Sequence, residues 1–154
     1  MHYLHPKTFS ILERYEIMPG DIFISIAGVN LGVAGVFNPN IKDRTILTEN
    51  AAKIQLIGDD VSGYIAEQIN GPVIQSQIES DKGIGAGVPK LALFRIESLL
   101  MPWPHPGEQN RILTQLSAAV EFLSQQEAVL TKYISLKAGL MHDLLTGTVR
   151  VPIT

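Results

Sequence analysis

The sequence predicts an α+β protein, in which a small mixed β-sheet domain with short helices is followed by one long C-terminal coiled-coil helix. Two patterns carry this prediction. Up to residue 105, short apolar segments alternate with turns rich in Gly, Pro, Asn and Asp. From residue 106 to residue 146, apolar residues recur at spacings of three and four. We therefore expect a domain over residues 1–105, a helix over 106–146 and a tail over 147–154.

The composition is that of a folded chain without disulfides. Apolar residues make up 45% of its 154 residues and the mean hydropathy is +0.17, so we expect a buried core. The absence of cysteine excludes disulfides and thiolate metal sites. We see neither a secretion leader nor an apolar run near the ~18 residues that span a bilayer, and we expect a cytoplasmic protein. The net charge of −3 argues against nucleic-acid binding by bulk charge, so such a role needs a local patch or a partner.

Three segments near the start of the domain predict strands. After the turn at residues 19–21, Ile22, Ile24 and Ile26 alternate with Phe23, Ser25 and Ala27, which predicts a strand buried on both faces. Residues 33–37 predict the second strand of a hairpin-like pair. Residues 51–57 (AAKIQLI) alternate most clearly and predict a further strand.

The following residues predict short helices and a stiff connection. Ser62 is a suitable cap for a helix that ends near Ile69, and Pro72 is suited to begin the next helix. Residues 91–99 predict a short helix, and the two residues after them a last strand. The proline-rich residues 102–106 (PWPHP) predict an extended linker, because proline fixes φ and keeps its predecessor out of the helical region.

The long helix carries an apolar seam that the small domain cannot cover. Its length from Glu108 to Leu145 would be roughly 57 Å at 1.5 Å per residue. Glu127 and Lys137 interrupt two apolar registers offset by three and four, the pattern of a coiled coil. We therefore expect a homodimer, with an antiparallel arrangement preferred because it can bring Glu127 and Lys137 together. The expected dimer contacts are Leu113, Leu116, Val120, Leu123, Leu130, Ile134, Met141 and Leu144.

No pattern indicates an active site. The loop KGIGAG fits neither GxxxxGK[ST] nor GxGxxG, so a nucleotide-using enzyme is a weak alternative. No Cys/His cluster has the spacing of a metal site. Basic and amide residues do occur in predicted loops and on strand faces, and such side chains hold phosphates or read base edges. The candidate DNA contacts are Lys42, Arg44, Lys53, Lys82, Lys90, Asn30 and Gln75.

Five segments in order, from about Pro19 to Val151, resemble a known protein family. They are GDIFISIAG, TENAAKIQLI, the loop GIGAGVPKL, MPWPHPGEQNRI and the helix end LKAGLMHDLLTGTVRV. The chain resembles the specificity subunits of type I restriction–modification enzymes, at the point where a target-recognition domain meets its long helix. The resemblance implies a partial recognition domain, because the family has several more strands before GDIFISIAG. It also implies a half-subunit, because a full subunit holds two such domains and two such helices.

The resemblance implies a non-catalytic DNA-recognition function. A recognition domain of this family reads one half of a bipartite target in double-stranded DNA, and the long helices space two domains and dock adenine methyltransferase subunits. S-adenosylmethionine then belongs to the partner methyltransferase, and this chain needs no cofactor. A restriction and translocase subunit can complete the assembly. The alternative is a helical oligomerisation or scaffold fragment of a broken specificity gene, without DNA affinity of its own.

Overall fold

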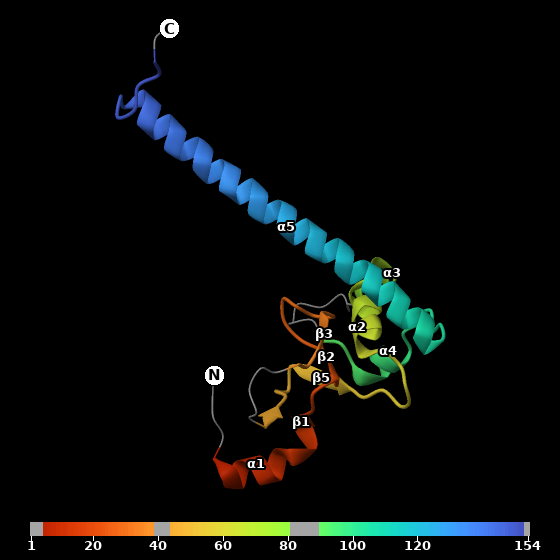
Figure 1. Cartoon of the computed structure of the whole chain (residues 1–154). Helices are drawn as coiled ribbons and strands as arrows, with labels where there is room; N and C mark the ends of the chain where they lie inside the picture. The colour runs from red at the N-terminus through yellow and green to blue at the C-terminus, as the bar shows by residue number, and fades with distance from the viewer. Residues whose placement is uncertain (1–4, 39–43, 81–89, 153–154) are drawn as a thin grey trace. The chain divides into compact units, whose positions relative to one another are not determined.

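A computed structural model of the chain describes residues 5–38, 44–80 and 90–152 (Figure 1). These residues divide into two compact units, residues 1–112 and residues 113–154. The globular unit therefore includes the first turns of the long helix, whereas the linker pattern predicts that the domain ends at residue 105. The chain begins with helix α1 (Pro6–Leu12) and a 3₁₀ helix (Glu13–Tyr15), in a segment whose sequence shows no strong pattern.

The α+β class is confirmed, with a correction to the type of sheet. Strands β2 (Ile22–Ser25), β3 (Ala34–Val36) and β5 (Ala51–Ile54) form a sheet of order β3-β2-β5. Strands β1 (Glu16–Ile17) and β4 (Thr45–Ile46) form a second, two-stranded sheet. Every pairing among the described strands is antiparallel, so the expectation of a mixed sheet is wrong. The turn at residues 28–32 is too short for the crossover that parallel strands need.

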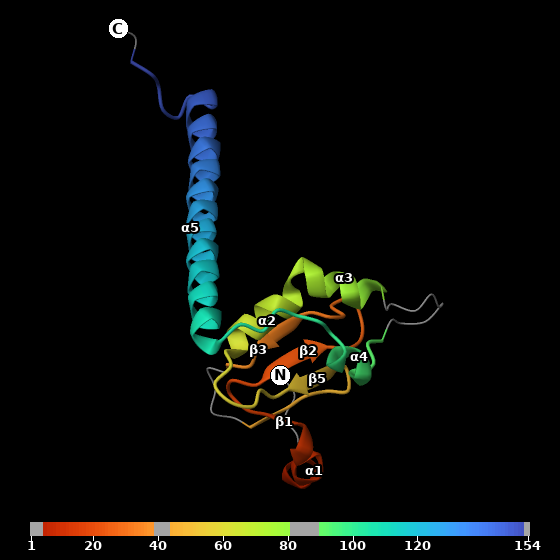
Figure 2. The same cartoon turned by 90° about the vertical axis from the view of Figure 1, so that its right-hand side faces the viewer.

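Helices cover one face of the three-stranded sheet. Helix α2 (Ser62–Asn70) and helix α3 (Pro72–Ser80) lie along that face (Figure 2). Ile22 and Ile24 are fully buried beneath them, and the opposed residues Ala52 and Ile54 of β5 lie on the same face. Phe23 lies on the other face, where its ring packs over Gly35. The strand is thus buried on one face and half-buried on the other, not buried on both as its composition predicts.

At two places a side-chain amide makes both of the backbone hydrogen bonds that a neighbouring strand would otherwise make. Asn70 of α2 both donates to Ala34 O and accepts from Ala34 N, at 2.9 Å each, on the outer edge of β3. Gln77 of α3 does the same for Leu100, donating to its carbonyl and accepting from its N–H at 2.9 Å each. The predicted strand at Leu100 and Met101 is therefore wrong, because a side chain from α3 takes the place of a neighbouring strand. Helix α4 (Leu93–Glu97) precedes this segment, within the region predicted to be helical.

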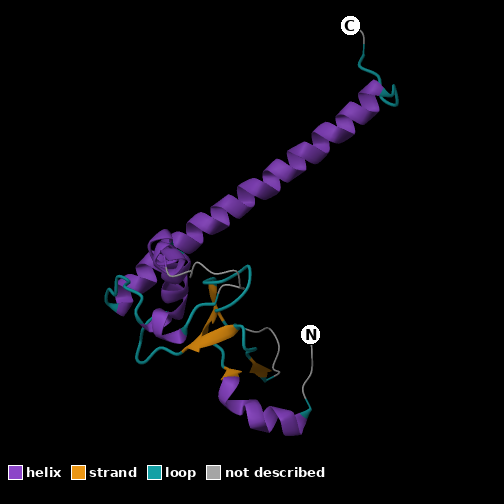
Figure 3. Cartoon of the chain, turned by 180° about the vertical axis from the view of Figure 1, so that it is seen from behind, coloured by secondary structure: helices purple, strands orange, loops and turns teal. Residues whose placement is uncertain are grey.

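The predicted long helix is confirmed as α5 (Pro106–Leu145), the longest helix in Figure 3. Pro106 takes the first helical position, where a missing N–H costs nothing. The His105 imidazole accepts a hydrogen bond from Gly107 N at 3.2 Å and so caps the helix. After the last turn, Gly147 adopts a φ of +73°, a conformation that favours glycine and ends helices. No helix in the described ranges is long and apolar enough to cross a membrane.

Candidate functional site

Two of the seven candidate DNA contacts, Asn30 and Lys90, are exposed and lie at the same end of strand β2. Asn30 lies in the turn between β2 and β3, and its carbonyl accepts from Val33 N at 3.0 Å. Lys90 lies opposite Ala27 in an isolated antiparallel bridge just after β2. Within the described ranges, no side-chain hydrogen bond or ion pair engages either residue. Both residues are exposed at this end of the sheet. Lys42 and Lys82 lie outside the described residues.

Arg44 is held by two carboxylates. Its guanidinium donates to both oxygens of Glu16, at 2.7 and 2.5 Å, and to Glu13 at 2.6 Å. The same group stacks over the Phe9 ring at 4.3 Å from its centre. The hydrogen bonds from Arg44 lower the pKa of the Glu16 carboxyl, and the same bonds raise the pKa of the Arg44 guanidinium. Arg44 thus ties β4 to the residues around β1, and its charge is paired with two carboxylates of the same chain.

Lys53 and Gln75 also have partners within the chain. Lys53 Nζ donates to the backbone carbonyl of Glu16 at 2.8 Å and lies 4.0 Å from the Asp21 carboxylate. Gln75 Nε2 donates to Gly32 O at 3.0 Å and to Ile69 O at 2.8 Å, so it joins α3 to α2 and to the β2–β3 turn. Contact with DNA stays a prediction for both residues, and it would require these bonds to break or be shared.

A buried amide at the start of α5 was not anticipated by the sequence analysis. Gln109 is fully buried, and it is the one buried polar side chain among the described residues. It bonds to Asp60 and Val61 before helix α2, and Asp60 also accepts from the Trp103 indole. A signal was present, because Gln109 lies seven residues before Leu116 and so holds a core position of the apolar seam. A polar residue at such a position indicates a specific partner.

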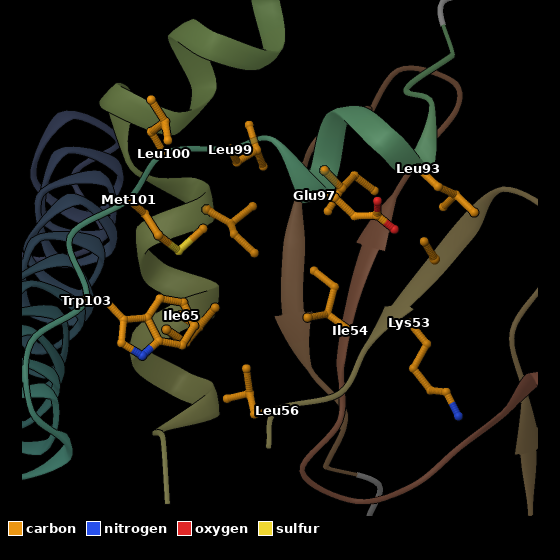
Figure 4. A pocket seen from close by; sticks show the side chains of 13 residues that line it. Lys53, Ile54, Leu56, Ile65, Leu93, Glu97, Leu99, Leu100, Met101 and Trp103 are labelled. Carbon is orange, nitrogen blue, oxygen red and sulfur yellow. The ribbon is translucent and has the colours of Figure 1, made fainter. Parts of the chain in front are cut away.

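An apolar groove of about 520 Å³ lies beside this junction, within the globular unit (Figure 4). Its walls come from Ile54 on β5, Ile65 on α2, Leu93 on α4 and the segment with Met101 and Trp103. Lys53 and Glu97 are the charged residues that line it. This lining lacks a set of convergent acid, base and nucleophile groups, and it is typical of a packing surface.

The predicted dimer residues form a stripe along α5 that is largely solvent-exposed. Leu113 is half-buried, and the exposed fractions of the others run from 45% at Leu116 and Leu144 to 65% at Val120. Nothing in residues 113–152 is buried. A helix that exposes this much apolar surface is expected to bury it against another helix.

The helix carries a second apolar stripe, which the sequence analysis missed. Phe122, Val129 and Leu136 recur every seven residues. Tyr133 and Leu140 follow Val129 and Leu136 by four residues on the same side of the helix. Each of the five side chains is 45% to 63% exposed. At 100° per residue, the two stripes lie roughly 110° apart around the helix. This seven-residue repeat is present in the sequence, but the prediction used only the longer seam. A helix with two such stripes can pack between two neighbouring helices, as in a bundle.

Neither known protein families nor a metal-binding group of side chains indicates a function for the part of the chain that the structure describes. No protein-family model matches the chain, and no curated protein matches it. Among the described residues, no group of three or more His, Cys, Asp or Glu side chains could hold a metal ion. The candidate functional surfaces are the exposed end of β2 in the globular unit and the two apolar stripes of α5.

Proposed function

We propose that this chain is a half-subunit of a type I restriction–modification specificity subunit, which reads one half of a bipartite double-stranded DNA target. The observation that carries the proposal is α5, a 40-residue helix that exposes apolar stripes on two sides and follows a small α+β unit. Such a helix serves assembly. Its start within the motif MPWPHPGEQNRI matches the place of the long helix in the family that the sequence resembles.

The first stripe supports an antiparallel homodimer with a specific register. When two helices face each other with residue 132 at the centre, Glu127 lies opposite Lys137 of the second copy. The same register pairs apolar residues with one another: Val120 with Leu144, Leu123 with Met141, and Leu130 with Ile134. Both interruptions of the seam are thus matched to each other, and the other seam pairs that lie within the helix are apolar, whereas Leu113 and Leu116 lie opposite residues beyond its end. A two-fold dimer of this kind carries two recognition domains for a two-part DNA site.

The second stripe supports docking of adenine methyltransferase subunits. Phe122, Val129, Tyr133, Leu136 and Leu140 lie on a side of α5 that the homodimer leaves open. A helical partner of apolar surface fits this stripe, and the resemblance implies methyltransferase subunits as that partner. S-adenosylmethionine would be held by those subunits. A restriction and translocase subunit can join the same cytoplasmic assembly.

The DNA-facing surface is proposed to include Asn30 and Lys90. Both are exposed at one end of β2, where an ammonium group can hold a phosphate and an amide can read a base edge. Arg44 and Lys53 are expected to contribute less, because their charges are already paired within the chain. The net charge of −3 gives little non-specific affinity, so the methyltransferase partner would supply much of the attraction to the phosphates.

The test of this function is selection of duplex DNA from a random library. The chain is used alone and together with an adenine methyltransferase of the type I class. We expect enrichment of one sequence in two symmetric halves with a fixed spacer. Lys90→Ala should weaken binding similarly across sequences and lower the salt slope by about one unit, whereas Lys132→Ala, on the exposed outer side of α5, is the matched control.

The alternative function is that of a helical scaffold without DNA affinity. The acidic balance of the chain and the internal pairing of Arg44 and Lys53 favour it. In that case the dimer and the methyltransferase complex would both form, and no DNA sequence would be enriched with the partner present. That outcome would overturn the recognition function and leave the assembly function standing.

A further inference from the structure

The amide of Gln109 joins three segments of the globular unit. Its Oε1 accepts from Val61 N at 2.8 Å, at the residue that caps helix α2. Its Nε2 donates to Asp60 Oδ1 at 2.7 Å and to Pro104 O at 2.9 Å. Both amide donors are therefore used, in a position with no exposure to solvent. Buried polar groups with all their donors satisfied fix one geometry, because any other arrangement leaves one of them unpaired.

The proline-rich segment before α5 is bonded at three consecutive residues. Pro102 O accepts from the Tyr64 hydroxyl at 3.3 Å, and the Trp103 indole donates to Asp60 Oδ2 at 3.2 Å. Pro104 O accepts from Gln109. One oxygen of Asp60 thus bonds to Trp103, within the proline-rich segment, and the other bonds to Gln109, three residues after that segment. The segment predicted to be an extended linker is tied to the start of α2.

The residues on either side of Gln109 complete this attachment. His105 caps α5 through its bond from Gly107 N, and Ile112 packs against the core cluster. Prolines at 102, 104 and 106 restrict φ along the connection. Together these contacts attach the first two turns of α5 to the core of the globular unit.

We propose that Gln109 is a positioning residue that determines the spacing of the DNA half-sites. The Gln109 clamp, formed by Gln109, Asp60, Val61, Trp103 and Pro104, holds the first turns of α5 on the globular unit. We expect this attachment to set the direction of the rest of the helix, and the spin-label distances described below test that expectation. The consequence for DNA spacing rests on the proposed dimeric function, whereas the clamp itself does not.

A purely packing role would be filled better by an apolar residue. Leucine or methionine has a similar volume and would avoid burying an amide, which costs stability unless every hydrogen bond is made. An amide instead specifies where the helix lies, because its donors and acceptor must meet Asp60, Pro104 and Val61 at once. Trp103 is the single tryptophan of the chain, so its fluorescence reports on this clamp alone.

The test measures the distance between two spin labels in one chain by pulsed electron paramagnetic resonance. The chain has no native cysteine, so Glu67→Cys on α2 and Gln125→Cys on α5 give two unique labels at exposed positions. Labelled chain is diluted with excess unlabelled chain, so that each dimer holds one labelled copy. We expect one narrow distance distribution, and a broad or multiple one with Gln109→Ala. Gln115→Ala, at an exposed position of the same helix, is the control and should leave the distribution narrow.

A second pair of variants separates positioning from loss of folding. Gln109→Glu keeps the size of the side chain but places a carboxylate against Asp60, and it should broaden the distribution. Adding Asp60→Asn supplies a donor from the opposite side and should narrow the distribution again. Far-ultraviolet circular dichroism and a cooperative urea-unfolding transition confirm that each variant is folded. A broad distribution in the unsubstituted chain, or a narrow one in folded Gln109→Ala and Gln109→Glu, would overturn the proposal.

Selection of DNA with a randomised spacer length then tests the consequence for recognition. The unsubstituted chain should favour one spacer, and Gln109→Glu should accept several while it still enriches the same half-site. If DNA is enriched with one spacer by both chains, the positioning role fails and the recognition function stands. If no DNA is enriched but the spin-label distances respond as expected, the clamp stands, while the recognition function and the role of Gln109 in spacing both fail.

Discussion

The globular unit and the helical unit treat their apolar residues in opposite ways. In residues 1–112, isoleucines of one strand and two helices close on each other, and Ile22, Ile24 and Ile74 have no exposed surface. In residues 113–152, no side chain is buried, although leucine, valine and isoleucine recur throughout. A sheet covered by helices completes a core within one chain, whereas a lone helix has no second layer. The first unit therefore buries an apolar core of its own, whereas the apolar stripes of the second stay exposed unless another helix covers them.

The largest expected effect comes from breaking the stripe of the helical unit. Leu123→Asp combined with Leu130→Asp should abolish the dimer, because burying two unpaired carboxylates in each helix costs more than the seam can offset. Sedimentation equilibrium at micromolar concentration should then give a single species near 16.8 kDa. Ala118→Asp with Gln125→Asp adds the same charge on the opposite side of the helix and should leave the dimer intact. A monomer for the unsubstituted chain would contradict the contrast between the two units.

A core substitution in the globular unit should have a smaller effect that does not depend on concentration. Ile24→Ala should lower the free energy of unfolding by about 2–5 kcal/mol, because it leaves a cavity under α2 and α3. Ile54→Ala should cost less, since Ile54 is half-buried and lines the open groove. Urea unfolding at two protein concentrations measures both. Equal losses at the two positions would contradict the deeper burial of Ile24.

A charge exchange sharpens the comparison by testing the register of the helical unit. Glu127→Lys should weaken the dimer, because it sets two lysines against each other at each of two symmetric places. Adding Lys137→Glu should restore association, since opposite charges then face each other again. The dissociation constants of the three chains, from sedimentation at several concentrations, provide the measurement. No recovery in the double variant would contradict the antiparallel register centred on residue 132.

The smallest effect concerns the exposed ion pair of the globular unit. Arg44 lowers the pKa of Glu16 below its ordinary value of 4.5, so the pair stabilises the folded state fully above that pH. The contribution is lost as the pH falls below 4.5 and through the lowered pKa. Thermal unfolding should therefore separate the unsubstituted chain from Glu16→Gln at pH 6, with the difference shrinking at lower pH. Glu67→Gln, exposed on α2, is the matched control, and the same pH-dependent loss there would remove the assignment.

The strands and helices whose apolar residues repeat at a regular period could be predicted from the sequence. Ile22 and Ile24 indicated their strand, and the seven-residue repeats of leucine indicated α5 to within one residue of its end. These patterns are local, because the period of a strand or a helix places residues on one face without reference to the rest of the chain. The exposure of the α5 stripe followed for the same reason, since the domain is too small to cover so long a helix.

The polar side chains that hydrogen-bond distant segments together could be identified only from the three-dimensional structure. Arg44, Lys53 and Gln75 are ordinary surface residue types in the sequence, yet each bonds to a segment distant in the chain, except for the short bond from Gln75 to Ile69. Gln77 replaced a predicted strand, and Gln109 joined the linker to α2, through partners 23 and 49 residues away in the sequence. Hydrogen bonds of this kind have no period, because they depend on where two segments meet. The fold therefore decides which amide becomes buried between segments and which cation remains exposed.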